Sequence, residues 1–173
     1  MRFSDIKRWF RARSTEMQLS SLAVGMNSSV DLARDLHVLF LDYDIRNIAD
    51  VEESVRELQS FWRLGEARIF KTRNGFHVFF FYDIMPYERA RMIVGFAKFV
   101  DPLFKQISYY YDHKSIRVAG KYQHRDIRFV KRIDGVRIPS SVERQLGDMK
   151  AAEHSFFLDN LKISRETGDI KKR

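Results

Sequence analysis

Two aspartates at the end of a hydrophobic segment are the residues of this sequence best suited to chemistry. Asp42 and Asp44 lie in the segment 39–45, which reads LFLDYDI. In a β-strand, residues i and i+2 point to the same face, so the two residues are expected about 7 Å apart at the backbone. Like charges this close need a compensating group, and Mg²⁺ or Mn²⁺ binds carboxylate oxygens while leaving positions open for phosphates. The pair suggests phosphate chemistry; the alternative is a solvated acidic turn after a strand.

A second group of chemically useful residues lies in the segment 71–77, which reads KTRNGFH. Its Asn-Gly pair is a strong signal for a β-hairpin turn, and glycine allows the backbone to approach a ligand closely. Thr72 offers a hydroxyl, Arg73 a cationic fork and His77 an imidazole, and these groups suit a triphosphate. The alternative is an ordinary turn followed by an inward-facing, hydrogen-bonded histidine.

The third motif lies in the segment 111–121, which reads YDHKSIRVAGK. It supplies a third carboxylate, Asp112, and two further cations, Arg117 and Lys121. If the strand that ends at Asp112 neighbours the strand of the first two aspartates, the three acids are able to share one or two cations, with the basic groups facing phosphates. The alternative is a charged loop in which Asp112 pairs with Lys114 or Arg117 at the surface, where such a pair contributes little stability.

Composition limits the classes of function. The 173 residues fit a single domain with a buried core, and 45% hydrophobic and 14% aromatic content is typical of a globular protein. A net charge of +8 favours a polyanionic partner such as nucleic acid or nucleotides. The absence of cysteine excludes disulfides, thiolate zinc sites and a cysteine nucleophile. No run approaches the length of a membrane span and the first residues do not resemble a signal peptide, so we expect an intracellular, soluble, cytoplasmic protein without a membrane partner.

Hydrophobic periodicity and turn residues predict an α+β fold, with helices flanking one face of a mainly antiparallel, RRM-like sheet. We expect one domain, made of an N-terminal helical segment (1–36), a core (37–135) and a C-terminal helix with a charged tail (136–173). Helices are predicted at 4–19, 50–62, 86–100 and 142–150, and strands at 37–44, 67–72, 76–82, 107–111, 115–118 and 127–132.

The three motifs, in this order, resemble those of the archaeo-eukaryotic primase superfamily. Members carry a strand ending in Asp-x-Asp, a Ser-x-x-Gly-x-His hairpin, and an acidic residue before an Arg-x-Pro-Gly segment. The corresponding segments here are LDYD at 41–44, TRNGFH at 72–77, and Asp112 followed by RVAG at 117–120. The resemblance covers residues 37–135. Thr72, Ala119 and Lys121 depart from the serine, proline and serine that are common in the family, and the zinc-bearing insertion of many catalytic subunits has no counterpart because cysteine is absent.

The resemblance implies a DNA primase-like nucleotidyltransferase that synthesises primers or short strands on a single-stranded DNA template during replication. Asp42, Asp44 and Asp112 would be the catalytic residues and would bind two Mg²⁺ or Mn²⁺ ions, which activate a 3′-hydroxyl and stabilise the leaving pyrophosphate. The incoming NTP or dNTP would be bound by a set of polar and basic side chains: Thr72, Arg73, His77, Arg117 and Lys121. The small size also leads us to expect a replication partner protein.

The main alternative is a catalytically silent subunit of a replication complex that binds nucleic acid or nucleotides. Such a protein would tolerate replacement of the aspartates, and exposed aromatic side chains would stack on bases. The candidates are Phe79, Phe81 and Tyr109–Tyr111, although aromatic residues of a strand are more often part of the core.

Two other functions fit the sequence less well. A rolling-circle replication nuclease also uses an RRM-like sheet, but it needs a His-hydrophobic-His pair, and the segment 76–79 has one histidine. A hydrolase with a two-carboxylate site leaves the basic hairpin without a role.

Overall fold

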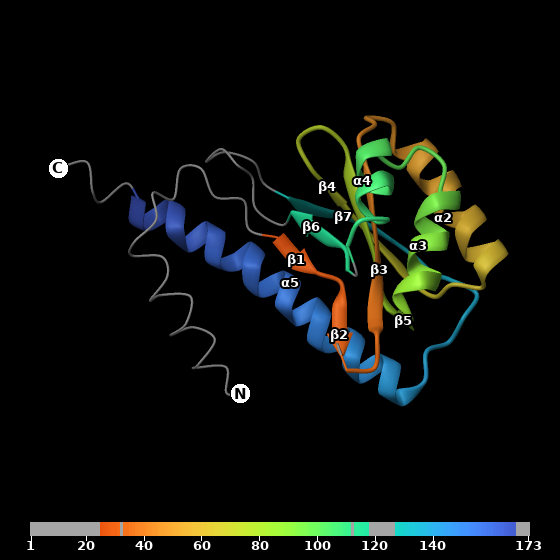
Figure 1. Ribbon diagram of the computed structural model, residues 1–173. Coiled ribbons are helices and arrows are strands. Elements are labelled where there is room, and N and C mark those ends of the chain that lie inside the picture. Colours follow the sequence, from red (N-terminus) through yellow and green to blue (C-terminus); the bar gives the residue numbers. More distant parts are fainter. Residues whose placement is uncertain (1–24, 32, 112, 118–126, 169–173) are drawn as a thin grey trace.

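The computed structural model describes residues 25–31, 33–111, 113–117 and 127–168, and its centre is an antiparallel sheet (Figure 1). In these residues the sheet has five strands, in the order β2 (Ser29–Asp31), β3 (Leu36–Tyr43), β5 (Phe76–Met85), β4 (Ala67–Lys71) and β7 (Arg128–Ile133). A separate pair is formed by β1 (Gly25–Asn27) and β6 (Ser115–Arg117). The described helices are α2 (Ile48–Trp62), α3 (Tyr87–Phe96), α4 (Pro102–Ile107) and α5 (Ser141–Gly168).

The two central strands, β3 and β5, are covered on both faces. Their apolar residues do not alternate with polar ones, and those at 38–41 and 78–81 are at most 2% exposed. Continuous apolar strands are typical of sheets with a layer packed on each side, whereas a sheet with one wet face shows alternation. The sequence of β3 and β5 therefore requires that other elements cover both faces.

Helices supply both of these layers. On one face, the Tyr43 hydroxyl lies 3.0 Å from Ser54 Oγ in α2, and α3 packs beside α2 and against β3. On the other face, the ring of His154 in α5 lies 4.5 Å from the rings of Phe70 and Phe79. Figure 1 shows α2 and α3 together on one side of the sheet and the long α5 crossing the other side. The α+β class and the antiparallel sheet agree with the prediction, but the helices cover both faces and not one.

Several local predictions can be compared with the observed elements. The expected order of strand, helix, two strands and helix is present as β3, α2, β4, β5 and α3. The predicted strand 107–111 is wrong: Asp101 caps α4 by accepting the Leu103 N–H, Pro102 begins this helix, and turns follow it. The predicted C-terminal helix 142–150 extends to residue 168. The predicted helix 4–19 lies outside the described residues. No helix of the described residues is long and apolar enough to cross a membrane.

His154 attaches α5 to the sheet in an unusual way for a titratable side chain. It is 2% exposed, and its ring packs against Phe70, Phe79 and Phe81. Its Nε2 has no hydrogen-bond partner among the described residues. Burial, and secondly the positive charge of Arg68, lowers the pKa of His154 to about 4. The folded protein therefore holds a neutral imidazole in an aromatic environment.

Burial of the His154 side chain predicts that this one residue contributes an acid-sensitive part of the free energy of unfolding. Between pH 6.5 and 4 the unfolded chain protonates His154 and the folded chain does not, so stability falls as the pH falls through this range, by a contribution on the order of 3 kcal/mol. His154→Phe removes the titration and fits the aromatic surroundings. We expect the variant to lose less of its unfolding free energy between pH 6.5 and 4, measured by urea denaturation. Ser155→Ala, an exposed neighbour, is the control; identical pH profiles for wild type and His154→Phe would contradict the prediction.

Candidate functional site

The first two motifs meet at one end of the central strand pair. Asp42 is the penultimate residue of β3 and lies opposite His77 of β5 in the register. Asp42 Oδ1 is 3.5 Å from His77 Nε2; the aspartate side chain is 32% exposed, whereas His77 is buried. Asp44 follows the strand and is exposed. The structure thus brings together the carboxylate and the imidazole that lie 35 positions apart in the sequence.

The hairpin between β4 and β5 packs directly on the end of β3. The Thr72 N–H donates to the Gly75 carbonyl at 3.0 Å, and the Gly75 N–H donates to Thr72 Oγ1 at 3.0 Å. A Cβ at Gly75 would lie 1.6 Å from the Tyr43 carbonyl oxygen, so no other residue fits without movement of the backbone. Close approach, and not a positive φ, is what requires glycine here. Arg73, at the tip, is exposed and makes no ion pair with the described residues.

The third motif is placed only in part. Asp112 and Lys121 lie outside the described residues. Arg117 ends β6, where its backbone pairs with Gly25 of β1 and not with the main sheet. Because residues 107–111 form the end of α4 and turns, no strand of the predicted kind leads from them to Asp112 beside β3. The predicted grouping of Asp112 with Asp42 stays a prediction.

Asp101 and Lys114, two charged residues that are not among the predicted site residues, lie next to this region. The Asp101 N–H donates to the Asp42 carbonyl at 2.8 Å, which fixes the start of α4 beside the end of β3. Lys114 is 3% exposed, donates to the Phe104 carbonyl, and has Nζ 4.0 Å from the centre of the Phe104 ring. Burial lowers the pKa of Lys114 to about 8, although the charge of Asp101 acts in the opposite direction. In the sequence, the Asp-Pro pair at 101–102 is typical of a helix start, and this pattern could have identified Asp101 as the cap of α4.

The aromatic candidates for base stacking divide into two groups. Phe79 and Phe81 are buried beneath α5, which confirms the interpretation that they belong to the core. Tyr109, Tyr110 and Tyr111 are 60 to 74% exposed in the turns after α4. The Arg91 guanidinium lies over the Tyr109 ring, 5.2 Å from its centre. Only the tyrosines are accessible to a ligand.

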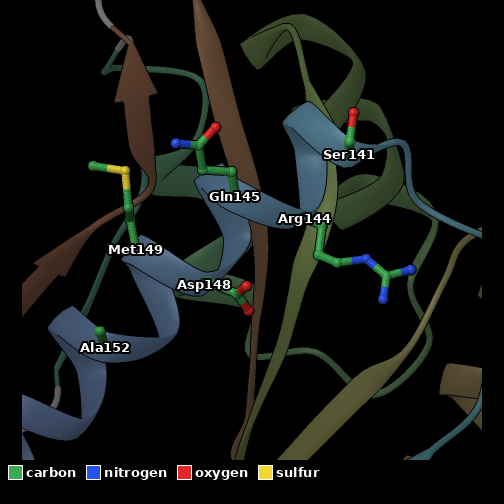
Figure 2. A pocket seen from close by; sticks show the side chains of 6 residues that line it. All are labelled: Ser141, Arg144, Gln145, Asp148, Met149 and Ala152. Carbon is green, nitrogen blue, oxygen red and sulfur yellow. The ribbon is translucent and has the colours of Figure 1, made fainter.

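A hollow on the outer surface of α5 is not part of this site. Its volume is about 580 Å³, and Figure 2 shows the six side chains of α5 that line it: Ser141, Arg144, Gln145, Asp148, Met149 and Ala152. All six are exposed. Tyr82 donates a hydrogen bond to Asp148, and Tyr82 lies five residues along β5 from His77. The hollow is therefore at the other end of the strand and offers no enclosed polar group to a ligand.

The donor set at the strand end fits a divalent metal incompletely. Asp42 and Asp44 supply the hard oxygen ligands that Mg²⁺ and Mn²⁺ prefer. Within the described ranges, no three histidine, aspartate or glutamate side chains gather as a metal site, and the expected third ligand, Asp112, lies outside them. Comparisons of the chain with protein-family models, with curated proteins and with solved structures found no match.

The fit of the hairpin against β3 predicts opposite effects of the same substitution at two glycines. In Gly75→Ala the new Cβ meets backbone atoms of Tyr43 and Asp44, so we expect the unfolding free energy to fall by about 3 kcal/mol or more. In Gly95→Ala, within α3, the new Cβ meets only the Tyr109 hydroxyl at 3.5 Å, and helix propensity should raise stability by about 0.5 kcal/mol. Urea denaturation of both variants measures the difference; a Gly75→Ala variant as stable as wild type would disprove the packing.

Proposed function

We propose that the chain is a small primase-like nucleotidyltransferase that copies a single-stranded DNA template with a divalent metal. One observation carries the proposal: the Asp-x-Asp segment and the Gly-x-His hairpin lie side by side. Asp42 Oδ1 is 3.5 Å from His77 Nε2, although the two residues are 35 positions apart in the sequence. Unrelated loop residues have no reason to meet in this order on paired strands. The juxtaposition supports the resemblance to the archaeo-eukaryotic primase superfamily.

In this proposal Asp42 and Asp44, together with Asp112, hold Mg²⁺ or Mn²⁺. When bound, the metal ions activate a 3′-hydroxyl and stabilise the pyrophosphate that leaves the incoming NTP or dNTP. His77 would position the Asp42 carboxylate, because its Nε2 lies 3.5 Å from Asp42 Oδ1. The hydroxyl of Thr72 and the guanidinium of Arg73 are at the hairpin tip, where they would bind the triphosphate.

Arg117 and Lys121 would add positive charge near the nucleotide. This role is proposed from the resemblance, because the Arg117 side chain and all of Lys121 lie outside what the structure describes. A partner protein that recruits the chain to DNA is likewise a proposal.

A catalytically silent binding subunit is the second candidate, and a specific observation favours it. Helix α5 packs on the same face of the sheet as Asp42 and His77, and His77 is 6% exposed. A polymerase needs this face open for a template and a nucleotide, whereas a binding subunit uses other surfaces. The two candidates predict different results for replacement of the aspartates.

The test is incorporation of labelled NTPs and dNTPs on single-stranded DNA, with and without a primer, in Mg²⁺ and in Mn²⁺. We expect metal-dependent products from the wild type and a loss of at least about 100-fold in Asp42→Ala/Asp44→Ala, because charge neutralisation at the phosphates disappears. Asp134→Ala is the control, since Asp134 is exposed and follows β7 at the opposite end of the sheet. Products that persist in the double variant would exclude this site, and the absence of any product, with template binding intact, would favour the silent subunit.

A further inference from the structure

Three cations, Arg46, Lys71 and Arg128, lie at the same end of the sheet. None of them is among the residues predicted to bind the metal or the nucleotide. Lys71 of β4 and Arg128 of β7 are direct cross-strand partners. Lys71 Nζ lies 4.0 Å from the centre of the Phe76 ring. Arg46 follows β3. Burial lowers the pKa of Lys71, and the positive charges of Arg46 and Arg128 lower it further. Arg46 and Arg128 are exposed and Lys71 is partly exposed.

These three side chains differ from neighbouring cations because no carboxylate of the described residues forms an ion pair with them. Further along β7, Lys131 is paired with Glu52 at 2.8 Å, and Arg132 is paired with Asp134 at 3.2 Å and Glu66 at 3.7 Å. Arg46, Lys71 and Arg128 make no ion pair with the described residues. Like charges directly opposite one another on paired strands are destabilising. An arrangement that keeps them together is therefore suited to binding an anion.

This cluster lies on the opposite face of the sheet from Asp42. Residues alternate along a strand, and Phe70 faces α5, so Lys71 points toward the face of α2. Its partners Phe76 and Arg128 are on the same face by the register. The sheet lies between the side chains of Lys71 and Arg128 and that of Asp42, so the cluster is an anion-binding surface distinct from the predicted triphosphate site.

We propose that Arg46, Lys71 and Arg128 bind the phosphate backbone of a single-stranded nucleic acid. Cations from three separate parts of the chain suit a series of successive phosphates, and β7 is the last strand of the sheet among the described residues. The choice of nucleic acid as the partner rests on the proposed function, but binding at this surface requires no catalysis.

The experiment measures binding of a fluorescent single-stranded oligodeoxythymidylate by anisotropy, without nucleotide and with EDTA, over a series of salt concentrations. Arg46→Gln/Arg128→Gln is compared with Lys131→Gln/Arg132→Gln, which removes the same two charges from cations that are already paired. We expect the first variant to bind at least about tenfold more weakly, and the slope of log K against log salt to decrease in magnitude by about 1.4, at about 0.7 per phosphate contact. The second variant should retain most of the affinity and slope.

Further measurements keep each outcome decisive. Equal losses in the two double variants would show that net charge alone acts, and an unchanged slope in the first variant would remove the surface from the binding site; either result overturns the proposal. Tripolyphosphate is the second probe: if the first variant loses tripolyphosphate binding but keeps oligonucleotide binding, the cluster takes a free phosphate group and not a strand, and the proposal is overturned. If the double variant fails to fold, Arg128→Gln alone is measured, with an expected slope change of about 0.7. Because oligonucleotide binding by the wild type is measured in EDTA, where no metal-dependent synthesis occurs, a failure of synthesis is distinguishable from a failure of this surface.

Discussion

The antiparallel pairing of β3 with β5 is the constraint on which the remaining structure depends. Its register places Asp42 opposite His77 and Phe40 opposite Phe79. Because side chains alternate with a period of two, a shift of one residue would move the aspartate and the aromatic rings to the other face. The same rings hold α5 through His154, and the same strand end receives the hairpin at Gly75. Core packing and the candidate site therefore use one register and are fixed together.

An irregularity in this pairing contains a buried charge. Between Val38 and Leu39 the register shifts, so that Val38 pairs with Ile84 and Leu39 with Phe80. Asp83 lies in the intervening part of β5, where it is buried, accepts the Gly65 N–H at 2.9 Å and contacts Arg137 Nη1 at 3.2 Å. Burial raises its pKa to about 6, despite the opposing effect of Gly65 and Arg137.

The folded chain consequently binds a proton at Asp83 between about pH 4 and 6 that the unfolded chain has released. Stability from this group is lost as the pH rises through that window. His154 acts in the reverse direction over nearly the same range. The two buried groups attach different elements to β5, α5 in one case and the segment around residue 65 in the other, so their contributions to the acid response oppose one another.

The sequence permits prediction of those features that have local signals. The apolar runs of β3 and β5, the Asn-Gly turn and the helix after Asp50 are each encoded within a few residues, and all are present. The strand β1 was missed because it lies in the short polar segment 20–29, which resembles a connection, and because its partner β6 is distant in the sequence. The strand β2 pairs with the adjacent β3 and was missed because it has only three residues. The aromatic segment 107–111 has strong strand propensity, yet the capped helix start at Asp101 and Pro102 determines its conformation.

The candidate site shows the same division. The strands that carry Asp42 and His77 could be predicted from their own patterns, whereas the register that places the two residues opposite each other has no local signal. The grouping of Arg46, Lys71 and Arg128 could not be predicted, because each comes from a different part of the chain and only Lys71 lies within one of the three motif segments, at its first position. Only the register of β4 with β7 and the path of the chain after β3 place them together.

The alternation of side chains along the strands explains why the carboxylates and the cations at this end do not neutralise one another. The neighbour of Asp42 on its own face is a histidine, whereas Lys71 and Arg128 face the other side of the sheet. If Lys71 occupied the position of Phe70, it would lie beside His77, within reach of the aspartate, and an internal ion pair would remove both charges from use. Under the proposed function, this separation would keep a negative group available to a metal ion and positive groups available to phosphates within one small region. A period of two in the strands is sufficient to provide it.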